Sequence, residues 1–139
     1  MGHILDARIA IESRFATNYT STPIHFWSAN VPFKPTPGQS YVAISISYGD
    51  GRQITLGEIP QVHRYTGIII VQIFTPEDKG AKASDDIADL VDPIFRRAQF
   101  SFGVSGVITC RTPVKEVVGV KDGWYQVNMK CLFKRDKQH

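Results

Sequence analysis

The chain has 139 residues, 42% of them hydrophobic and 21% charged, and its 16 basic and 13 acidic side chains give a formal charge of +3. This length predicts a single domain over residues 1–139, because two halves would each be too small to bury an adequate core. The composition is that of a soluble globular protein and argues against disorder. No apolar run approaches the roughly 20 residues of a membrane-spanning helix. The first residues lack a secretory-signal pattern, so we expect a protein that stays in the cytoplasm without a membrane partner.

Much of the positive charge lies near the end of the sequence. The basic residues there are Lys130, Lys134, Arg135 and Lys137, and Asp136 is the only acidic residue among them. We interpret residues 134–139 as a solvated basic tail, because a nucleic-acid binder usually concentrates more charge than this on one face. A small nucleic-acid-binding α+β module stays open as an alternative function.

The first predicted element is a helix. Ile4, Leu5, Ile11 and Phe15 recur at helical spacing, with charged side chains at positions between them. This pattern is typical of an amphipathic helix with one apolar face, and it predicts that the helix ends near residues 17–18.

A proline-rich segment follows a short extended piece over residues 24–27. Residues 32–37 contain three prolines, and proline fixes φ and removes a backbone hydrogen-bond donor. The segment is therefore extended and not helical. Two interpretations stay open: a rigid loop, or an arm that lies on the domain with Val31 and Phe33 as its anchors.

From residue 41 the apolar residues alternate with small polar ones. Val42, Ile44 and Ile46 would share one face of a strand. Residues 49–51 have the sequence Gly-Asp-Gly, and these residue types tolerate the positive φ of a tight turn. They predict a hairpin with a projecting tip and a returning strand over residues 52–56.

The strongest strand signal lies over residues 64–74. Its central run, Ile-Ile-Ile-Val at residues 68–71, is β-branched and would be apolar on both faces. A strand of this kind must be covered on both faces. Helices can cover one face, whereas the other requires more of this chain or a neighbouring subunit. This requirement is the first physical indication of assembly.

The remaining sequence predicts one helix followed by strands. A helical stripe is formed by Ile87, Leu90, Val91, Ile94 and Phe95, and Pro93 predicts a kink or a break within it. Later strands are expected over residues 100–103, 106–110, 114–120 and 124–133. The order of elements predicts an α+β fold, with an antiparallel-rich β-sheet, two helices packed on one face and a projecting β-hairpin.

Catalytic patterns are absent from the sequence. It contains no P-loop, dinucleotide-binding, zinc-protease or nucleophile-elbow motif, and none of the four histidines pairs with another at ligand spacing. Cys110 and Cys131 are interpreted as buried free thiols rather than as a disulfide or part of a metal site. The carboxylates over residues 85–92 are interpreted as the solvated face of the second helix. We therefore expect no enzymatic activity, no cofactor and no metal.

Several segments together resemble a known family. They are residues 30–35 (Asn-Val-Pro-Phe-Lys-Pro), 41–44 (Tyr-Val-Ala-Ile), the turn at 57–60, the strand 64–74 that begins Arg-Tyr-Thr-Gly, and 123–128 (Gly-Trp-Tyr-Gln-Val-Asn). In this order and spacing the chain is similar to the tail terminator, or tail completion, proteins of long-tailed bacteriophages, and more narrowly to a phage-related family formerly of unknown function. The resemblance covers nearly the whole chain, and none of its segments is a catalytic motif.

The resemblance implies a structural virion protein. Such a protein would form a ring of six copies on the end of the tail tube, terminate tube polymerisation and provide the surface for head attachment. The implied partners are further copies of the chain, the tail tube protein and the head completion or connector protein, while DNA passes through the lumen without specific recognition. Assembly would occur in the bacterial host cytoplasm, and the protein would lie at the tail–neck junction of the virion. Another head–tail joining or neck protein with the same fold stays open as an alternative.

No interface residue can be transferred from the resemblance, because the family's motifs do not define its contacts. From the expected pattern of exposure we predict that five residues contact neighbouring subunits or the tube. They are Arg52, Gln53, Arg64, Tyr65 and Trp124.

Overall fold

The computed structural model describes residues 2–29, 33–54 and 61–138. Its elements in chain order are α1 (His3–Asn18), β1 (Ile24–Phe26), the 3₁₀ turn η1 (Trp27–Ala29), β2 (Tyr41–Gln53), β3 (Val62–Pro76), the 3₁₀ turn η2 (Glu77–Lys79), α2 (Gly80–Phe95), β4 (Gln99–Phe102), β5 (Gly106–Cys110), β6 (Val114–Lys121) and β7 (Trp124–Gln138).

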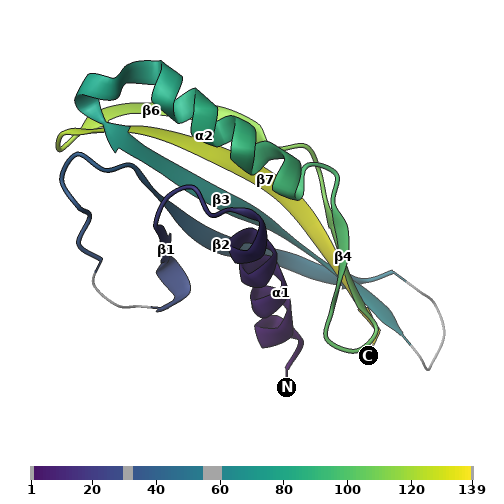
Figure 1. Ribbon diagram of the computed structural model, residues 1–139. Helices are drawn as coiled ribbons and strands as arrows, with labels where there is room; N and C mark the ends of the chain where they lie inside the picture. The colour runs from purple at the N-terminus through teal and green to yellow at the C-terminus, as the bar shows by residue number, and fades with distance from the viewer. Residues whose placement is uncertain (1, 30–32, 55–60, 139) are drawn as a thin grey trace.

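The strands form one curled sheet of seven strands (Figure 1). Its order is β1-β2-β3-β7-β5-β4, and β6 pairs with the first half of β7. Every pairing is antiparallel except the short parallel contact between β1 and β2. The α+β class and the antiparallel-rich sheet predicted from the sequence are confirmed.

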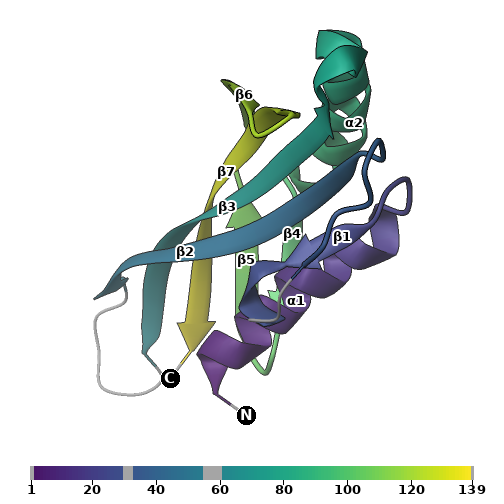
Figure 2. The same ribbon diagram turned by 90° about the vertical axis from the view of Figure 1, so that its left-hand side faces the viewer.

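Both helices pack on the same face of the sheet (Figure 2). The helical stripe of α1 buries Ile11 and Phe15, and the stripe of α2 buries Val91 and Phe95. The ring of Phe15 stacks on that of Phe95 with 6.0 Å between centroids, so the two helices meet each other as well as the sheet. Burial of each such side chain stabilises the fold by about 1.5–3 kcal/mol.

The β2–β3 hairpin is longer than predicted. Residues 49–51 are not its turn, because β2 continues to Gln53 and pairs with β3 as far as His63. The ladder only changes register between Tyr48 and Gly51, and neither glycine there has positive φ. Gly51 instead leaves room for the Tyr65 ring, which a β-carbon at that position would overlap. Of the predicted returning strand, residues 52 and 53 belong to β2, and residues 55–56 lie outside the described residues.

The structure corrects the sequence predictions at two further places. Residues 134–138 are not a free basic tail, because they form the end of β7 and pair with β3 on one side and with β5 on the other. Of the kink or break predicted at Pro93, the break is absent, since α2 runs through it to Phe95 as one helix. Only two helical residues follow this proline, so it removes one hydrogen bond from a helix that is already ending.

Strand β3 is covered very differently on its two faces. Ile69, Val71 and Ile73 point to the helices and are buried, whereas Ile68 and Ile70 alternate with them and are only half-buried. We call the sheet surface opposite the helices the open face. The sequence predicted that this side of β3 is covered, and the described residues cover it only at one end.

Candidate interaction surfaces

The open face is closed at one end by aromatic side chains. Tyr41 stacks on Phe74 with 4.7 Å between ring centroids and meets Trp124 edge-on at 5.2 Å. Phe33 lies 5.0 Å from Tyr41, so the proline-rich segment is fastened to the sheet at this point. This contact favours the interpretation of an anchored arm, in which Phe33 is one anchor. The other predicted anchor, Val31, lies outside the described residues.

The opposite end of the open face is basic. A groove of about 440 Å³ lies there, and Arg64, Thr66 and Lys134 from β3 and β7 line it. The other lining residues are Arg52, Gly67, Thr109, Arg111, Leu132 and Phe133. Leu132 gives the groove an apolar floor, since its side chain is 50% exposed. We call this site the basic groove.

Two arginines of the basic groove occupy directly opposite positions on neighbouring strands. Arg52 is the direct cross-strand partner of Arg64, and like charges in this position repel. Arg64 is compensated by Asp136, because its Nε and Nη2 donate to the two carboxylate oxygens at 2.8 and 3.0 Å. These hydrogen bonds raise the pKa of Arg64. Among the described residues, no ion pair compensates Arg52, Arg111 or Lys134.

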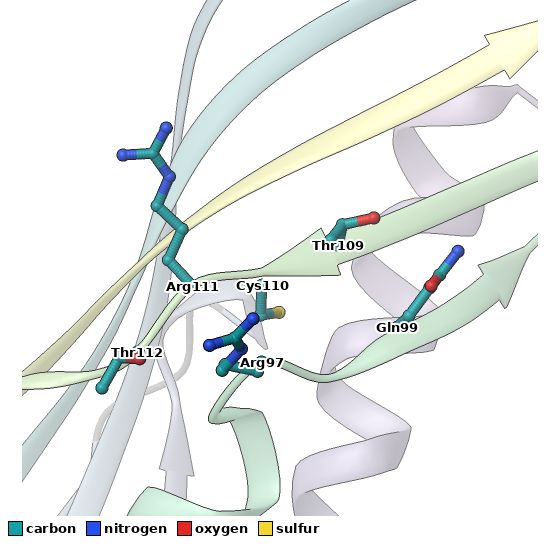
Figure 3. A pocket seen from close by; sticks show the side chains of 6 residues that line it. All are labelled: Arg97, Gln99, Thr109, Cys110, Arg111 and Thr112. Atoms are coloured by element: carbon teal, nitrogen blue, oxygen red, sulfur yellow. The ribbon is translucent and has the colours of Figure 1, made fainter.

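A second hollow, of about 640 Å³, continues from the basic groove around the end of β5 (Figure 3). It shares Thr109 and Arg111 with the groove and adds Arg97, Gln99, Cys110 and Thr112. Figure 3 shows Arg111 projecting from the end of β5 and Arg97 on the other side of the strand in that view. Arg97 has φ of 51° directly after α2, and its backbone N–H donates to the carbonyl of Arg111 at 3.3 Å. The hollow therefore adds one more cation next to the groove.

The thiol in this hollow is not an activated nucleophile. Cys110 and Cys131 are both buried and free, as the sequence predicted. A hydrogen bond with Cys131, together with burial, raises the pKa of Cys110 well above its usual range. A thiol needs a lowered pKa to react at neutral pH. Cys110 is therefore a core residue, whose partner across the ladder is Phe133.

Tyr65 lies on the helix side of the sheet, away from the basic groove. The guanidinium of Arg135 sits 4.4 Å above its ring and 5.5 Å from the ring of Tyr48. Arg135 is only 4% exposed, and its Nη1 donates to Nδ1 of His3 at 2.7 Å. Burial lowers the pKa of Arg135, and its Nε has no hydrogen-bond partner in the described part of the chain. Sequence patterns missed this cluster, because a charged residue near the end of a chain normally faces solvent.

The predicted contact residues are thus divided between three places. Arg52 and Arg64 lie together in the basic groove, and Tyr65 supports Arg135 on the other face. Trp124 belongs to the aromatic end, since it pairs with Pro76 at the far end of β3. Gln53 is the last residue of β2, and its side chain lies outside the described part of the structure.

The solvent side of α2 is acidic. Asp85, Asp86 and Asp89 lie opposite its buried stripe, and we call them the acidic α2 surface. Lys82 pairs with Asp86 at 2.9 Å and Lys115 with Asp85 at 2.8 Å, while no ion pair forms with Asp89 among the described residues. Asp86 and Asp89 are exposed, in agreement with the predicted solvated face, whereas Asp85 and Asp92 are half-buried. No cluster of three or more metal-ligating side chains occurs among the residues that the structure describes.

Strand β6 exposes both its backbone edge and its side chains. It pairs only with β7 among the described strands, and Val114, Val117, Val118 and Val120 are all exposed. A β-bulge between Val117 and Gly119 shifts its register by one residue. Exposed, apolar edge strands readily pair with other chains, and bulges limit such pairing.

No helix in the described part of the chain is long and apolar enough to cross a membrane.

Comparison with known proteins identifies the chain. A family model described as phage tail terminator protein matches residues 6–130. One solved protein structure superposes with a TM-score of 0.71 at 19% sequence identity, covering 97% of this chain and 96% of the other, which shows a shared fold. No curated protein matches the sequence significantly. The chain is therefore a structural protein of phage tails. It belongs to the phage tail terminator protein family.

Proposed function

We propose that this protein forms a ring, of six copies, on the end of the phage tail tube. The ring terminates tube polymerisation and provides the surface to which the head completion or connector protein attaches. The match of residues 6–130 to the tail terminator family carries this proposal. The chain acts in it as one domain over residues 1–139, at the tail–neck junction of a virion that is assembled in the host cytoplasm.

The uncovered surfaces support an assembly function. Half-buried Ile68 and Ile70 and exposed Leu132 continue across the middle of the open face. Apolar side chains in this arrangement gain free energy when a partner covers them, at about 25 cal/mol per Å² of buried apolar surface. The exposed valines of β6 add a second apolar surface at a sheet edge. A ring subunit needs two such different surfaces, because its two neighbours contact it on different sides.

The five predicted contact residues enter this proposal differently. Arg52 and Arg64 contact a neighbouring subunit or the tube from the β2–β3 end of the open face, and Gln53 stays a predicted contact at the end of β2. Trp124 and Tyr65 are half-buried by contacts within the chain. They stay predicted contacts through the parts of their rings that remain exposed.

DNA passes through the ring without sequence-specific recognition in this proposal. The basic groove is the one observation that favours a nucleic-acid-binding module instead. Binding to phosphates would weaken steeply with added salt. Sub-micromolar, salt-dependent binding of an oligonucleotide by the isolated protein would support that second function. A neck protein with the same fold would differ by binding to heads rather than to tube ends.

Arrest of tube growth tests the proposed function. Tail tube protein is polymerised alone and with increasing amounts of this protein, and tube lengths are measured by electron microscopy. The proposal predicts shorter tubes with this protein bound at one end, and saturation at a fixed number of copies per tube. Unchanged tube lengths and unlabelled tube ends at all concentrations would contradict it. Adding the protein only after polymerisation is complete is the control, because existing lengths should then persist.

A further inference from the structure

We propose that neighbouring copies join by placing the acidic α2 surface of one copy against the basic groove of the next. This inference rests on the proposed ring and names the surfaces that close it. The partner is a second copy of the chain, recognised through opposite charges. Four observations lead to this assignment: the division of charge along the chain, the repulsion inside the groove, the positions of the two surfaces and their exposure.

Charge is strongly divided within the molecule. Residues 77–96 contain six acidic and three basic side chains, which is 3 − 6 = −3. The whole chain carries +3, so the remainder carries +3 − (−3) = +6. The basic groove and the hollow beside it contribute five cations, namely Arg52, Arg64, Arg97, Arg111 and Lys134. One chain therefore presents two surfaces of opposite sign.

The repulsion between Arg52 and Arg64 indicates that the groove lacks an anion. Asp136 satisfies Arg64 from the β7 side, but Arg52 faces Arg64 from β2 without an acidic neighbour among the described residues. A carboxylate supplied from outside would lie between cations that now repel each other. Like charges at directly opposite positions of a ladder are unfavourable, so a carboxylate from a neighbouring copy would be favourable beside this pair.

The two surfaces are placed as a ring requires. The basic groove lies on the open face, near the start of β3 and the end of β7. Helix α2 lies on the other face and follows the far end of β3 through η2 (Figures 1 and 2). Because the groove lies on the open face and α2 covers the other face, the two surfaces of one copy point away from each other, although α2 ends beside Arg97 and Arg111. They can meet only between copies, in the head-to-tail manner that generates closed rings.

The side chains of the acidic α2 surface are accessible to a partner. The side chain of Asp86 is 63% exposed and that of Asp85 is 49% exposed. Their ion pairs with Lys82 and Lys115 are solvent-exposed, and such pairs contribute little stability. Replacing these lysines as ion-pair partners by the arginines of a neighbouring groove therefore costs little stability. Nucleic acid would not compete for α2, because phosphates and carboxylates repel.

A charge-swap mixing experiment tests the inference. The groove variant carries Arg52→Glu and Lys134→Glu, and the helix variant carries Asp86→Lys and Asp89→Lys. Each variant, their equimolar mixture and the wild type are added to tail tubes, and ring formation at tube ends is counted by electron microscopy and native mass spectrometry. Lys34→Glu with Lys121→Glu is the matched control, because both lysines are exposed and lie outside the two surfaces.

The inference predicts a specific pattern of loss and rescue. Each variant alone should form rings at least about tenfold less, since like charges meet at every contact. The mixture should recover assembly to within about twofold of the wild type, because alternating copies restore opposite charges at every contact of a six-membered ring. The control should assemble as the wild type does. Circular dichroism and thermal unfolding check that each variant folds, and Arg52→Gln and Asp89→Asn replace a variant that does not.

Other outcomes overturn the inference in distinguishable ways. Variants that assemble like the wild type, or a mixture that fails to recover, would exclude this interface while leaving the ring itself intact. Loss of duplex DNA binding by the groove variant, without rescue on mixing, would assign the groove to phosphates instead. Absence of rings with the wild type would contradict the proposed function, and the interface with it.

Discussion

Arg52 and Arg64 face each other directly across the β2–β3 ladder, and within the described part of the chain only Arg64 has an acidic partner, Asp136. The pair predicts opposite effects of two similar substitutions. Arg52→Thr should raise the free energy of unfolding by about 0.2–1 kcal/mol, because it removes a like-charge neighbour and adds a β-branched residue. Arg64→Thr should lower it by about 0.5–1 kcal/mol, because it removes the two hydrogen bonds to Asp136. Urea unfolding measures both, and equal signs for the two substitutions would contradict the account.

The buried Arg135 predicts a difference between loss of volume and loss of charge. Arg135→Ala should lower the free energy of unfolding by about 2–4 kcal/mol, because it opens a cavity between the Tyr48 and Tyr65 rings. Arg135→Met should change it by less than about 1 kcal/mol, since it keeps the volume and removes a charge whose Nε lacks a hydrogen bond. Thermal and urea unfolding compare the two. Equal losses would show that the cation–π contacts dominate instead.

Gly67 predicts a steric effect in the centre of the β2–β3 ladder. A β-carbon at this position would lie 2.6 Å from the Phe133 ring and 2.6 Å from the carbonyl oxygen of Ser47. Gly67→Ala should therefore lower the free energy of unfolding by about 1–3 kcal/mol, since a backbone atom cannot move aside. Gly2→Ala is the control, because no atom lies within 4 Å of a β-carbon placed there. An unchanged midpoint of the unfolding transition for Gly67→Ala would contradict the described packing.

The two cysteines predict slow modification of the native protein. The hydrogen bond with Cys131, together with burial, raises the pKa of Cys110, and the same hydrogen bond lowers the pKa of Cys131, but both thiols are buried and closed to a reagent in the folded protein. A colourless disulfide reagent that releases a coloured thiolate should react with both cysteines in urea and only slowly without it. Because access requires opening of the core, the native rate should follow the unfolding equilibrium. Rapid labelling of the native protein would contradict the buried position of these thiols.

The sequence predicted the helices and strands most accurately where the spacing of hydrophobic residues matches the face that packs against the core. The stripes of α1 and α2 and the alternation in β2 mostly predicted the face that the core buries, although Ile4 and Leu90 of those stripes are exposed. The gap between the predicted strands 114–120 and 124–133 contains the turn at Asp122 and Gly123, where both residues have positive φ. The Gly-Asp-Gly sequence at residues 49–51 led to a wrong turn prediction, because Gly51 makes room for the Tyr65 ring and does not adopt positive φ. A local sequence pattern cannot distinguish these two reasons for a glycine.

Long-range contacts account for what the sequence did not reveal. Residues 134–138 are polar on both faces, and they form a strand because β3 and β5 flank them. The basic groove likewise brings together residues from separate elements: Arg52 from β2, Arg64 from β3, Lys134 from β7, and Arg111, which directly follows β5. Arg52 and Arg64 were predicted as contacts from exposure alone, but their opposition across the ladder depends on a register that the predicted turn had placed elsewhere.

Image reconstruction of tube ends tests the central claim most directly. Tail tubes assembled with this protein are imaged by cryo-electron microscopy, and the terminal density is averaged without imposed symmetry. The account predicts one ring of six copies that closes the end of the tube, with the folded sheet and both helices visible in each copy. Tube ends without this protein, or density along the tube wall instead of at its end, would contradict the proposal that it terminates the tail.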